Sequence, residues 1–432
     1  MQINIPNKCK HSAIIPKTGL ILLCLILILS AGSVSLASSN LSGHILKEST
    51  GSAGQESGRT DTDGKGDSLS GNAGFQSQAK SALLMEASTG TILYEKDADS
   101  RRPPASITKI MTLLLIFDAM ESGSLKAEDS ITVSEHAASM GGSQVFLEAG
   151  ESQTADTMIK CIAVSSANDA CVAMAEHIAG SEEAFVDRMN QRAQELGMTS
   201  THFVNCCGLD ADGHYTSARD VALMSRELIK SYPQVFNYTG IWMDTITHVT
   251  RRGSSEFGLS NTNKLIRQYE GATGLKTGST GKAGFCLSGT AKRDEVSLIA
   301  VVMGCESGKA RVAACSALLD YGFANCRLYK DDNPPSLPDV RVSGGRADRI
   351  SCRPAGTFSC VIGKDTDLNQ IRKEVNLTEE ISAPVKAGQS LGTLSYYLGE
   401  EKLGEVEIIS ENRVDKARYG DCAGRLLDAL ST

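Results

Sequence analysis

The order of predicted strands and helices in residues 79–325 constrains the fold more than any other feature of the sequence. Short apolar runs over 81–86 and 91–94 flank a Ser-Thr-Gly turn, which predicts a β-hairpin. Near the other end, 285–292 and 296–304 are predicted as paired strands. Helical patterns are predicted elsewhere, over 106–117, 154–164, 169–179, 182–196, 216–230 and 309–323. We therefore expect an α/β fold with one sheet built from both ends of the segment and a helical insertion between them.

The chain on either side of this segment differs in composition. Residues 38–78 are rich in Gly, Ser, Asp and Thr and have almost no large apolar residues, which predicts a flexible linker. From Cys326 onward Pro, Gly and Val recur and the predicted strands are short, so we expect a small all-β domain over 326–412. A total of 432 residues allows two or three domains.

The charge of the chain argues against a nucleic-acid partner. There are 43 Lys and Arg against 51 Asp and Glu, a net charge of −8. A protein that binds a phosphate backbone needs the opposite sign. One Trp and 5% aromatic residues also argue against a binder that stacks on bases or sugars.

The first 37 residues resemble a secretory signal peptide. Lys8, Lys10 and Lys17 precede an unbroken apolar run over 20–29, and Ser35-Leu36-Ala37 places small residues at a cleavage site. An uncleaved membrane anchor is the alternative, but the run is shorter than the ~20 residues that span a bilayer. We therefore expect an exported protein.

The cysteines do not form a recognisable disulfide framework. Of 13 Cys, 11 follow the predicted signal peptide, an odd number without a CxxC pattern. Most are expected to be small core residues. Two pairs are close enough in sequence to bridge, Cys206 with Cys207 and Cys352 with Cys360. The seven His show no metal-binding spacing, so neither a metal nor a cofactor is predicted.

Ser106 and Lys109 are the first candidates for chemistry. At i and i+3 on a helix they share one face and lie within reach of each other. A Ser hydroxyl needs a base, and a Lys that is desolvated or repelled by another cation can be that base. The spacing alone is weak evidence, because SxxK also occurs at Ser77/Lys80 and at Ser279/Lys282, and a solvated helix face explains most such pairs.

Two further motifs follow in the order SxN and KTG. Ser166-Ala167-Asn168 lies at the junction of two predicted helices, where helix capping is the alternative explanation. Lys276-Thr277-Gly278 is expected just before a strand, where Gly278 would let a substrate backbone approach and an ordinary turn is the alternative. The three motifs together are typical of enzymes that form a serine acyl-enzyme with β-lactams or peptides.

On these motifs the chain resembles the serine-type D-alanyl-D-alanine carboxypeptidases, the low-molecular-mass penicillin-binding proteins. The resemblance covers about 79–412 and includes the segments 104–112, 165–170, 261–265, 276–284, 301–304 and 383–388. It implies a β-lactamase-like antiparallel sheet flanked by helices, with a helical subdomain and a small C-terminal all-β domain. One departure is Asn205-Cys206-Cys207-Gly208-Leu209, where the family usually has Pro after the Asn, which predicts a less rigid loop.

The resemblance implies a catalytic role for four residues. Ser106 would attack the penultimate D-Ala carbonyl of the cell-wall pentapeptide, with Lys109 as general base. Ser166 would relay a proton to the leaving amine, and Asn168 would hold the peptide and orient Lys109. β-Lactams would acylate Ser106 and leave slowly.

It also implies a set of substrate-binding residues. Lys276 and Thr277 would bind the terminal carboxylate beside Gly278, and the charge of Lys276 would help keep Lys109 neutral. The backbone N–H groups of Ser106 and Ser279 would form the oxyanion hole. Arg311 would be a second carboxylate-binding cation.

Other readings of the same motifs make distinct predictions. A class A β-lactamase would have Asp in place of Ala167, a Glu-bearing loop for deacylation and no residues 330–412. A non-catalytic wall-binding protein would not need Ser106, Lys109 and Lys276 intact. Endopeptidase activity on peptidoglycan cross-links is a variant of the main reading that the sequence leaves open.

Residues 413–432 predict an amphipathic tail that contacts the membrane. Its apolar side chains form one helical stripe, Tyr419, Cys422, Ala423, Leu426, Leu427 and Leu430. Members of the resembled family often end in such an interfacial anchor. A helix packed on its own protein is the alternative, because the patch is short and its charges cancel.

Overall fold

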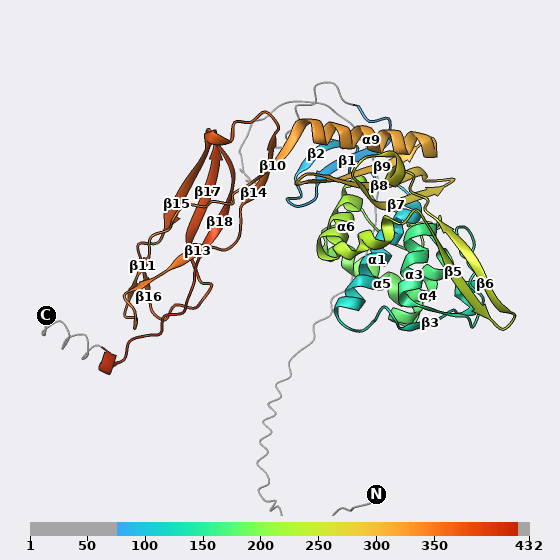
Figure 1. Cartoon of the computed structure of the whole chain (residues 1–432), viewed down its shortest axis with the longest axis horizontal. Helices are drawn as coiled ribbons and strands as arrows, with labels where there is room; N and C mark the ends of the chain where they lie inside the picture. The colour runs from blue at the N-terminus through green and yellow to red at the C-terminus, as the bar shows by residue number, and fades with distance from the viewer. Residues whose placement is uncertain (1–75, 422–432) are drawn as a thin grey trace, which may run out of the picture. The chain divides into compact units, whose positions relative to one another are not determined.

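The computed structural model describes residues 76–421 (Figure 1). The predicted signal peptide, almost all of the predicted linker and most of the apolar stripe of the tail lie outside the described residues. Within 76–421, no helix combines the length and the apolar character needed to cross a membrane.

A five-stranded antiparallel sheet organises the part of the chain that holds the three motifs. Its strand order is β2-β1-β9-β8-β7, so the first two strands of the segment lie against the last three. β1 pairs with β9 along its whole length. The strands are β1 Ser81–Glu86, β2 Ile92–Lys96, β7 Ala272–Thr280, β8 Gly284–Arg293 and β9 Val296–Cys305. The prediction of one sheet built from both ends is confirmed.

Helices cover both faces of this sheet (Figure 1). α9 (Gly308–Asn325) lies across one face, where Leu318 and Leu319 share an apolar cluster with Leu84 and Leu298. The other face carries the helical insertion. Its helices on that face are α1 Lys109–Glu121, α2 Glu135–Ala138, α3 Ala155–Lys160, α4 Asn168–Ala179, α5 Glu182–Glu195, α6 Ala218–Ser231 and α7 Phe236–Thr239. The short α8, Leu265–Gln268, packs on the α9 face, where Leu265 joins the apolar cluster of Leu318 and Leu319. α1 is apolar on nearly all sides and is buried along most of its length, as expected of a central helix.

The helix predicted over 309–323 runs two residues further than expected, to Asn325, and Gly322 lies inside it. A Cβ on Gly322 would lie 2.6 Å from Leu298 Cδ1 and 2.9 Å from Leu84 Cδ2. This glycine therefore serves close helix–sheet packing, and no cap is needed there.

Short hairpins complete the insertion. β3 (Ser130–Thr132) pairs with β4 (Ser152–Thr154), and β5 (Met243–Thr250) pairs with β6 (Gly253–Ser260). The sequence did not predict β5 and β6, because most of their side chains are exposed and the apolar alternation that marks a half-buried strand is weak.

The residues after α9 form an all-β unit, which confirms that prediction. Its sheets have the orders β10-β14, β12-β11-β16 and β13-β18-β17-β15. The strands are β10 Cys326–Lys330, β11 Val340–Ser343, β12 Arg349–Ile350, β13 Cys352–Pro354, β14 Ser359–Gly363, β15 Ile371–Leu377, β16 Glu380–Ser382, β17 Ser390–Leu398 and β18 Glu401–Ser410. Beyond β18, single bridges pair Val414 with Val385 and Lys416 with Gly345.

Candidate active site

Ser106 and Lys109 lie side by side at the start of the central helix. Ser106 is in a 3₁₀ turn, Ala105–Thr108, that leads directly into α1. Lys109 Nζ is 3.3 Å from Ser106 Oγ, and it donates to Asn168 Oδ1 at 2.6 Å and to the Cys207 carbonyl at 2.7 Å. Lys109 is fully buried. The amine of Lys109 therefore connects the SxxK motif to Asn168 of the SxN motif.

Two glycines from distant segments hold the turn that carries Ser106. Ala105 has a positive φ of 49°, a strained conformation for a residue with a side chain. A Cβ on Gly208 would lie 1.8 Å from the Ala105 carbonyl oxygen, and a Cβ on Gly278 would lie 3.0 Å from Ser106 N. We expected Gly278 to make room for a substrate. In the structure the turn that carries Ser106 occupies that space.

Ser166 and Asn168 stand between two helices, as predicted. Ser166 adopts a left-handed conformation with φ 61° after a π-turn, Cys161–Ser165, and Asn168 begins α4. Asn168 Nδ2 donates to the Gly141 carbonyl at 2.7 Å, which fixes the orientation of the amide toward Lys109. Ser166 Oγ is buried and has no hydrogen-bond partner within residues 76–421.

The KTG motif lies inside a strand rather than before one. Lys276, Thr277 and Gly278 are in the second half of β7, and Lys276 is paired with Ser288 of β8. Gly and Lys have low strand propensity, so the local sequence concealed a strand that pairing with β8 stabilises. Thr277 Oγ1 is 2.6 Å from Thr262 Oγ1, which belongs to one of the family-like segments.

Lys276 is a buried cation close to two others. It is 1% exposed, and its amine donates to the Thr277 carbonyl at 3.3 Å. Burial, together with the charges of Lys109 and Arg311, holds the pKa of Lys276 well below its usual value. An anion placed here would offset that cost.

Arg311 reaches the same strand from α9. Its guanidinium donates to the carbonyls of Gly278 at 3.2 Å, Cys286 at 3.5 Å and Thr262 at 3.5 Å. Burial lowers the pKa of Arg311. The structure therefore brings Arg311 to the KTG strand, although its contacts there are with backbone carbonyls.

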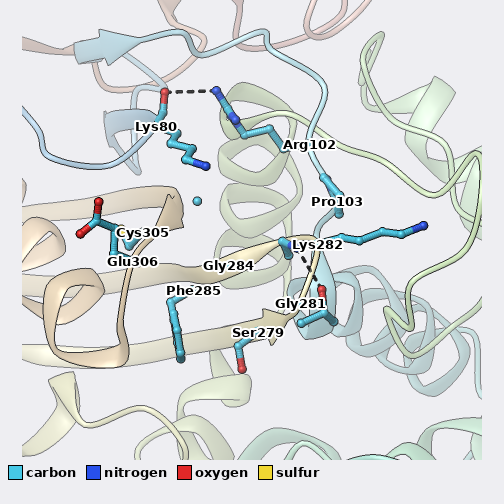
Figure 2. A pocket seen from close by; sticks show the side chains of 13 residues that line it. Lys80, Arg102, Pro103, Ser279, Gly281, Lys282, Gly284, Phe285, Cys305 and Glu306 are labelled. Carbon is cyan, nitrogen blue, oxygen red and sulfur yellow. Dashed lines mark hydrogen bonds between the residues drawn. The ribbon is translucent and has the colours of Figure 1, made fainter.

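Ser279 is exposed at the end of this strand, beside a cavity of about 600 Å³. Figure 2 shows the cavity, which Lys80, Arg102 and Lys282 line together with Glu306. Three cations and one acid give it a positive character.

The loop that lacks the family's Pro is held by hydrogen bonds. Asn205 Oδ1 accepts from the backbone N–H groups of Cys207 at 3.2 Å, Gly208 at 2.7 Å and Leu209 at 3.0 Å. These bonds restrain the loop at Asn205, and the expectation that it is less rigid without Pro stays a prediction. The loop lies outside the three motifs, and no local pattern in the sequence indicated that its Cys207 carbonyl accepts a hydrogen bond from Lys109 Nζ.

All ten described cysteines are free, so neither proposed pair is a disulfide. Cys206 Sγ and Cys207 Sγ are 3.6 Å apart. Eight of the ten are buried, as expected of small core residues.

His214 lies directly behind the nucleophile turn. Val204 N–H donates to its Nδ1 at 2.9 Å, so Nε2 carries the proton and donates to Thr108 Oγ1 at 2.9 Å. Burial, with a smaller effect of His202, lowers the pKa of His214 to about 4. The neutral form is therefore the one that fits the fold.

We expect His214 to make the free energy of unfolding fall as the pH is lowered. Its stabilising effect is complete above the unfolded pKa of about 6.5 and is lost as the pH falls toward 4, a loss of about 3 kcal/mol. Urea unfolding followed by Trp242 fluorescence at pH 7 and pH 4.5 measures it. His214→Asn, which keeps an acceptor near Nδ1, should remove this part of the pH dependence. An equal loss in both proteins would contradict the assignment.

The fold and the three motifs together define a serine-type peptidase of the penicillin-binding class. The sequence profile described as D-alanyl-D-alanine carboxypeptidase matches residues 68–307, and that of the penicillin-binding protein 5 C-terminal domain matches 323–416. The chain belongs to the D-alanyl-D-alanine carboxypeptidase family, which confirms the resemblance found in the sequence.

Individual relatives agree with this membership. The chain is 44% identical over 345 residues to D-alanyl-D-alanine carboxypeptidase DacF of Bacillus subtilis, covering 79% of this chain and 87% of the relative. It is 33% identical to DacA of Escherichia coli K12, covering 82% and 87%. The structure of penicillin-binding protein 5 from Haemophilus influenzae superposes with a TM-score of 0.70 at 28% identity, covering 79% of this chain and 98% of that one.

Proposed function

We propose that this protein is a D-alanyl-D-alanine carboxypeptidase that removes the terminal D-Ala from peptidoglycan pentapeptide stems through an acyl-enzyme on Ser106. The observation that carries the proposal is the 3.3 Å contact between Lys109 Nζ and Ser106 Oγ in a buried site. β-Lactams, which resemble the stem terminus, would acylate the same hydroxyl.

In this mechanism neutral Lys109 takes the proton of Ser106 as its oxygen attacks the penultimate D-Ala carbonyl. The backbone N–H groups of Ser106 and Ser279 stabilise the oxyanion, an effect typically worth about 10²–10³ in rate. Lys109 passes this proton through the hydroxyl of Ser166 to the leaving D-Ala amine. Water then attacks the ester as Lys109 takes one of its protons, and Lys109 gives that proton to Ser106 Oγ as the ester breaks.

Substrate selection depends on the free carboxylate of the terminal D-Ala. Lys276 is the cation with which this group would pair, supported by Thr277 and by the charge of Arg311. The lowered pKa of Lys276 fits this role, because a bound carboxylate offsets the cost of burying the charged amine beside Arg311.

Lys276→Ala should lower turnover of free-carboxylate substrates at least about thirtyfold, since losing one partner of a buried charged pair costs about 2–5 kcal/mol. Turnover of the amidated analogues should fall much less. Steady-state D-Ala release from both substrates measures the difference. Lys292→Ala, an exposed lysine on the neighbouring strand β8, is the matched control. Equal losses on both substrates would assign Lys276 a structural role.

Assays on three substrates test the function as a whole. We expect D-Ala release from a pentapeptide and formation of a lasting penicillin adduct. Cleavage of a cross-linked dimer would add endopeptidase activity. Rapid penicillin hydrolysis without an adduct would favour a β-lactamase, and no reaction with any substrate would indicate a non-catalytic wall-binding protein.

The site of action follows from the substrate, which lies outside the cytoplasmic membrane. We infer that residues 1–37 direct export and that 38–78 link the leader to the catalytic domain at 79–325. The β domain at 326–412 then precedes the tail at 413–432. Family membership supports an extracytoplasmic location.

The tail is proposed to contact the membrane surface through its apolar stripe, which begins at the exposed Tyr419. The signal-cleaved protein should float with liposomes in a density gradient, and a protein ending at Ser410 should not. Because the four basic and three acidic side chains of 413–432 leave a net charge of only +1, flotation should depend little on anionic lipid. Equal flotation of the two proteins would end this proposal.

A further inference from the structure

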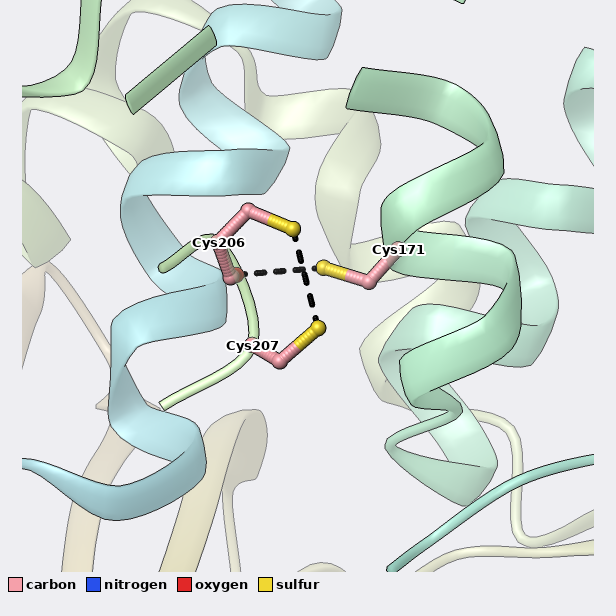
Figure 3. A group of neighbouring side chains, drawn as sticks. All are labelled: Cys171, Cys206 and Cys207. Atoms are coloured by element: carbon pink, nitrogen blue, oxygen red, sulfur yellow. Dashed lines mark hydrogen bonds between the residues drawn. The ribbon is translucent and has the colours of Figure 1, made fainter. Parts of the chain in front are cut away.

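Three thiols meet directly behind the catalytic amine. Cys171 is on α4, and Cys206 and Cys207 are on the loop that precedes Gly208 (Figure 3). Their sulfur atoms all lie within 4.8 Å of one another, and all three side chains are buried. Within residues 76–421 this is the only group of three or more His, Cys, Asp or Glu side chains with ligand atoms this close.

The spacing of the sulfurs suits a metal ion better than a disulfide. A metal–thiolate bond of about 2.3 Å in a trigonal arrangement places the sulfurs about 4 Å apart. Cys206 Sγ and Cys207 Sγ are already 3.6 Å apart, so ligation requires only small side-chain movements. Soft thiolates select zinc and other thiophilic metals over hard cations such as magnesium or calcium.

We propose that Cys171, Cys206 and Cys207 form a trithiolate site for a soft divalent cation, zinc or cadmium, that inhibits acylation of Ser106 when occupied. Three thiols lose three protons to solvent, and one divalent cation binds the three thiolates, which leaves a net charge of −1. No oxidation occurs. Val204 and Leu209, on either side of the two adjacent thiols, are exposed, so the cation approaches from this surface.

The inhibition follows from what the thiol segment touches, and this part rests on the proposed function. The Cys207 carbonyl accepts from Lys109 Nζ, and Cys207 Sγ is 3.5 Å from the Asn168 carbonyl. Ligation draws the Cys207 segment toward the cation and shifts the carbonyl that holds Lys109 Nζ, which moves the amine from its 3.3 Å contact with Ser106 Oγ. A displacement of about 1 Å from the reactive geometry costs about 10² in rate. The Cys206 carbonyl, which accepts from Thr112 at 2.7 Å, ties the same segment to α1.

Cadmium titration of the reduced, metal-free full-length protein tests the site without relying on activity. We expect thiolate-to-cadmium absorption that saturates at one ion per chain with release of up to three protons. Cys206→Ala and Cys171→Ser should each weaken binding at least tenfold. Cys315→Ala, which removes a buried thiol on α9 outside the cluster, should bind as the parent does. Absorption that survives both cluster variants, or no binding at all, would overturn the site.

The second measurement is the rate of penicillin acylation with and without saturating cadmium. We expect at least a tenfold slowing in the parent and in Cys315→Ala, and none in Cys206→Ala at the same cadmium concentration. An unchanged rate in the saturated parent would overturn the inhibition. A metal-free parent that fails to acylate would refute the proposed function, while the absorption titration would still decide the metal site.

Discussion

Ser106→Ala should abolish both penicillin labelling and D-Ala release. The Ser106 hydroxyl is the one that Lys109 Nζ approaches, at 3.3 Å, and loss of the nucleophile removes the covalent step itself. Intact-protein mass spectrometry should show one penicillin per chain in the parent, located on the peptide that holds Ser106. The adduct should persist for minutes or longer. Lys109→Ala should fold yet acylate about 10²–10⁴-fold more slowly, the usual contribution of a general base.

The chain offers a matched control for this result in a second SxxK sequence. Ser77→Ala removes a buried serine three residues before Lys80, outside the three motifs. It should label and release D-Ala as the parent does. Labelling that survives Ser106→Ala would refute the assignment of the nucleophile, and with it the reading of all three motifs.

Gly208→Ala should impair acylation nearly as severely, although residue 208 belongs to none of the motifs. Its Cβ would lie 1.8 Å from the Ala105 carbonyl oxygen and 2.9 Å from Ser106 N, so the turn that carries Ser106 must move. A displacement of about 1 Å from the reactive geometry costs about 10² in rate. Stopped-flow measurement of penicillin acylation should show at least that loss.

Gly213→Ala separates this clash from backbone strain. Gly213 also has a positive φ, 83° against 87° at Gly208, but its Cβ would meet no atom closer than 3.8 Å. Both variants are destabilised by the unfavourable φ, but only Gly208→Ala should displace Ser106. Similar acylation rates in the two variants would show that packing against Ala105 does not position Ser106.

Local patterns in the sequence anticipated the parts of the site that depend on residue type. The spacing of Ser106 and Lys109 placed the two side chains on one face, and they are in contact in the structure. The junction containing Ser166 and Asn168 was also placed between two helices, as found. These predictions succeeded because helical periodicity and capping act over only a few residues.

The position of the KTG motif was misjudged for a complementary reason. Lys276-Thr277-Gly278 carries little strand propensity of its own, and its strand exists because β8 pairs with it and because Gly278 fits against the nucleophile turn. The β5–β6 hairpin was missed because its exposed residues lack a local apolar signal. In each case the structure depended on a partner that lies elsewhere in the chain.

The sequence by itself thus determined the family, the sheet assembled from both ends and the residue types that we propose to react. Only the tertiary structure decided how those groups are held: Gly208 against Ala105, the Cys207 carbonyl on Lys109 and Cys171 beside two thiols 35 and 36 positions further along the chain. The physical reason is range. Propensity and periodicity are read within one element, whereas these contacts join elements whose proximity is set by packing of the whole core.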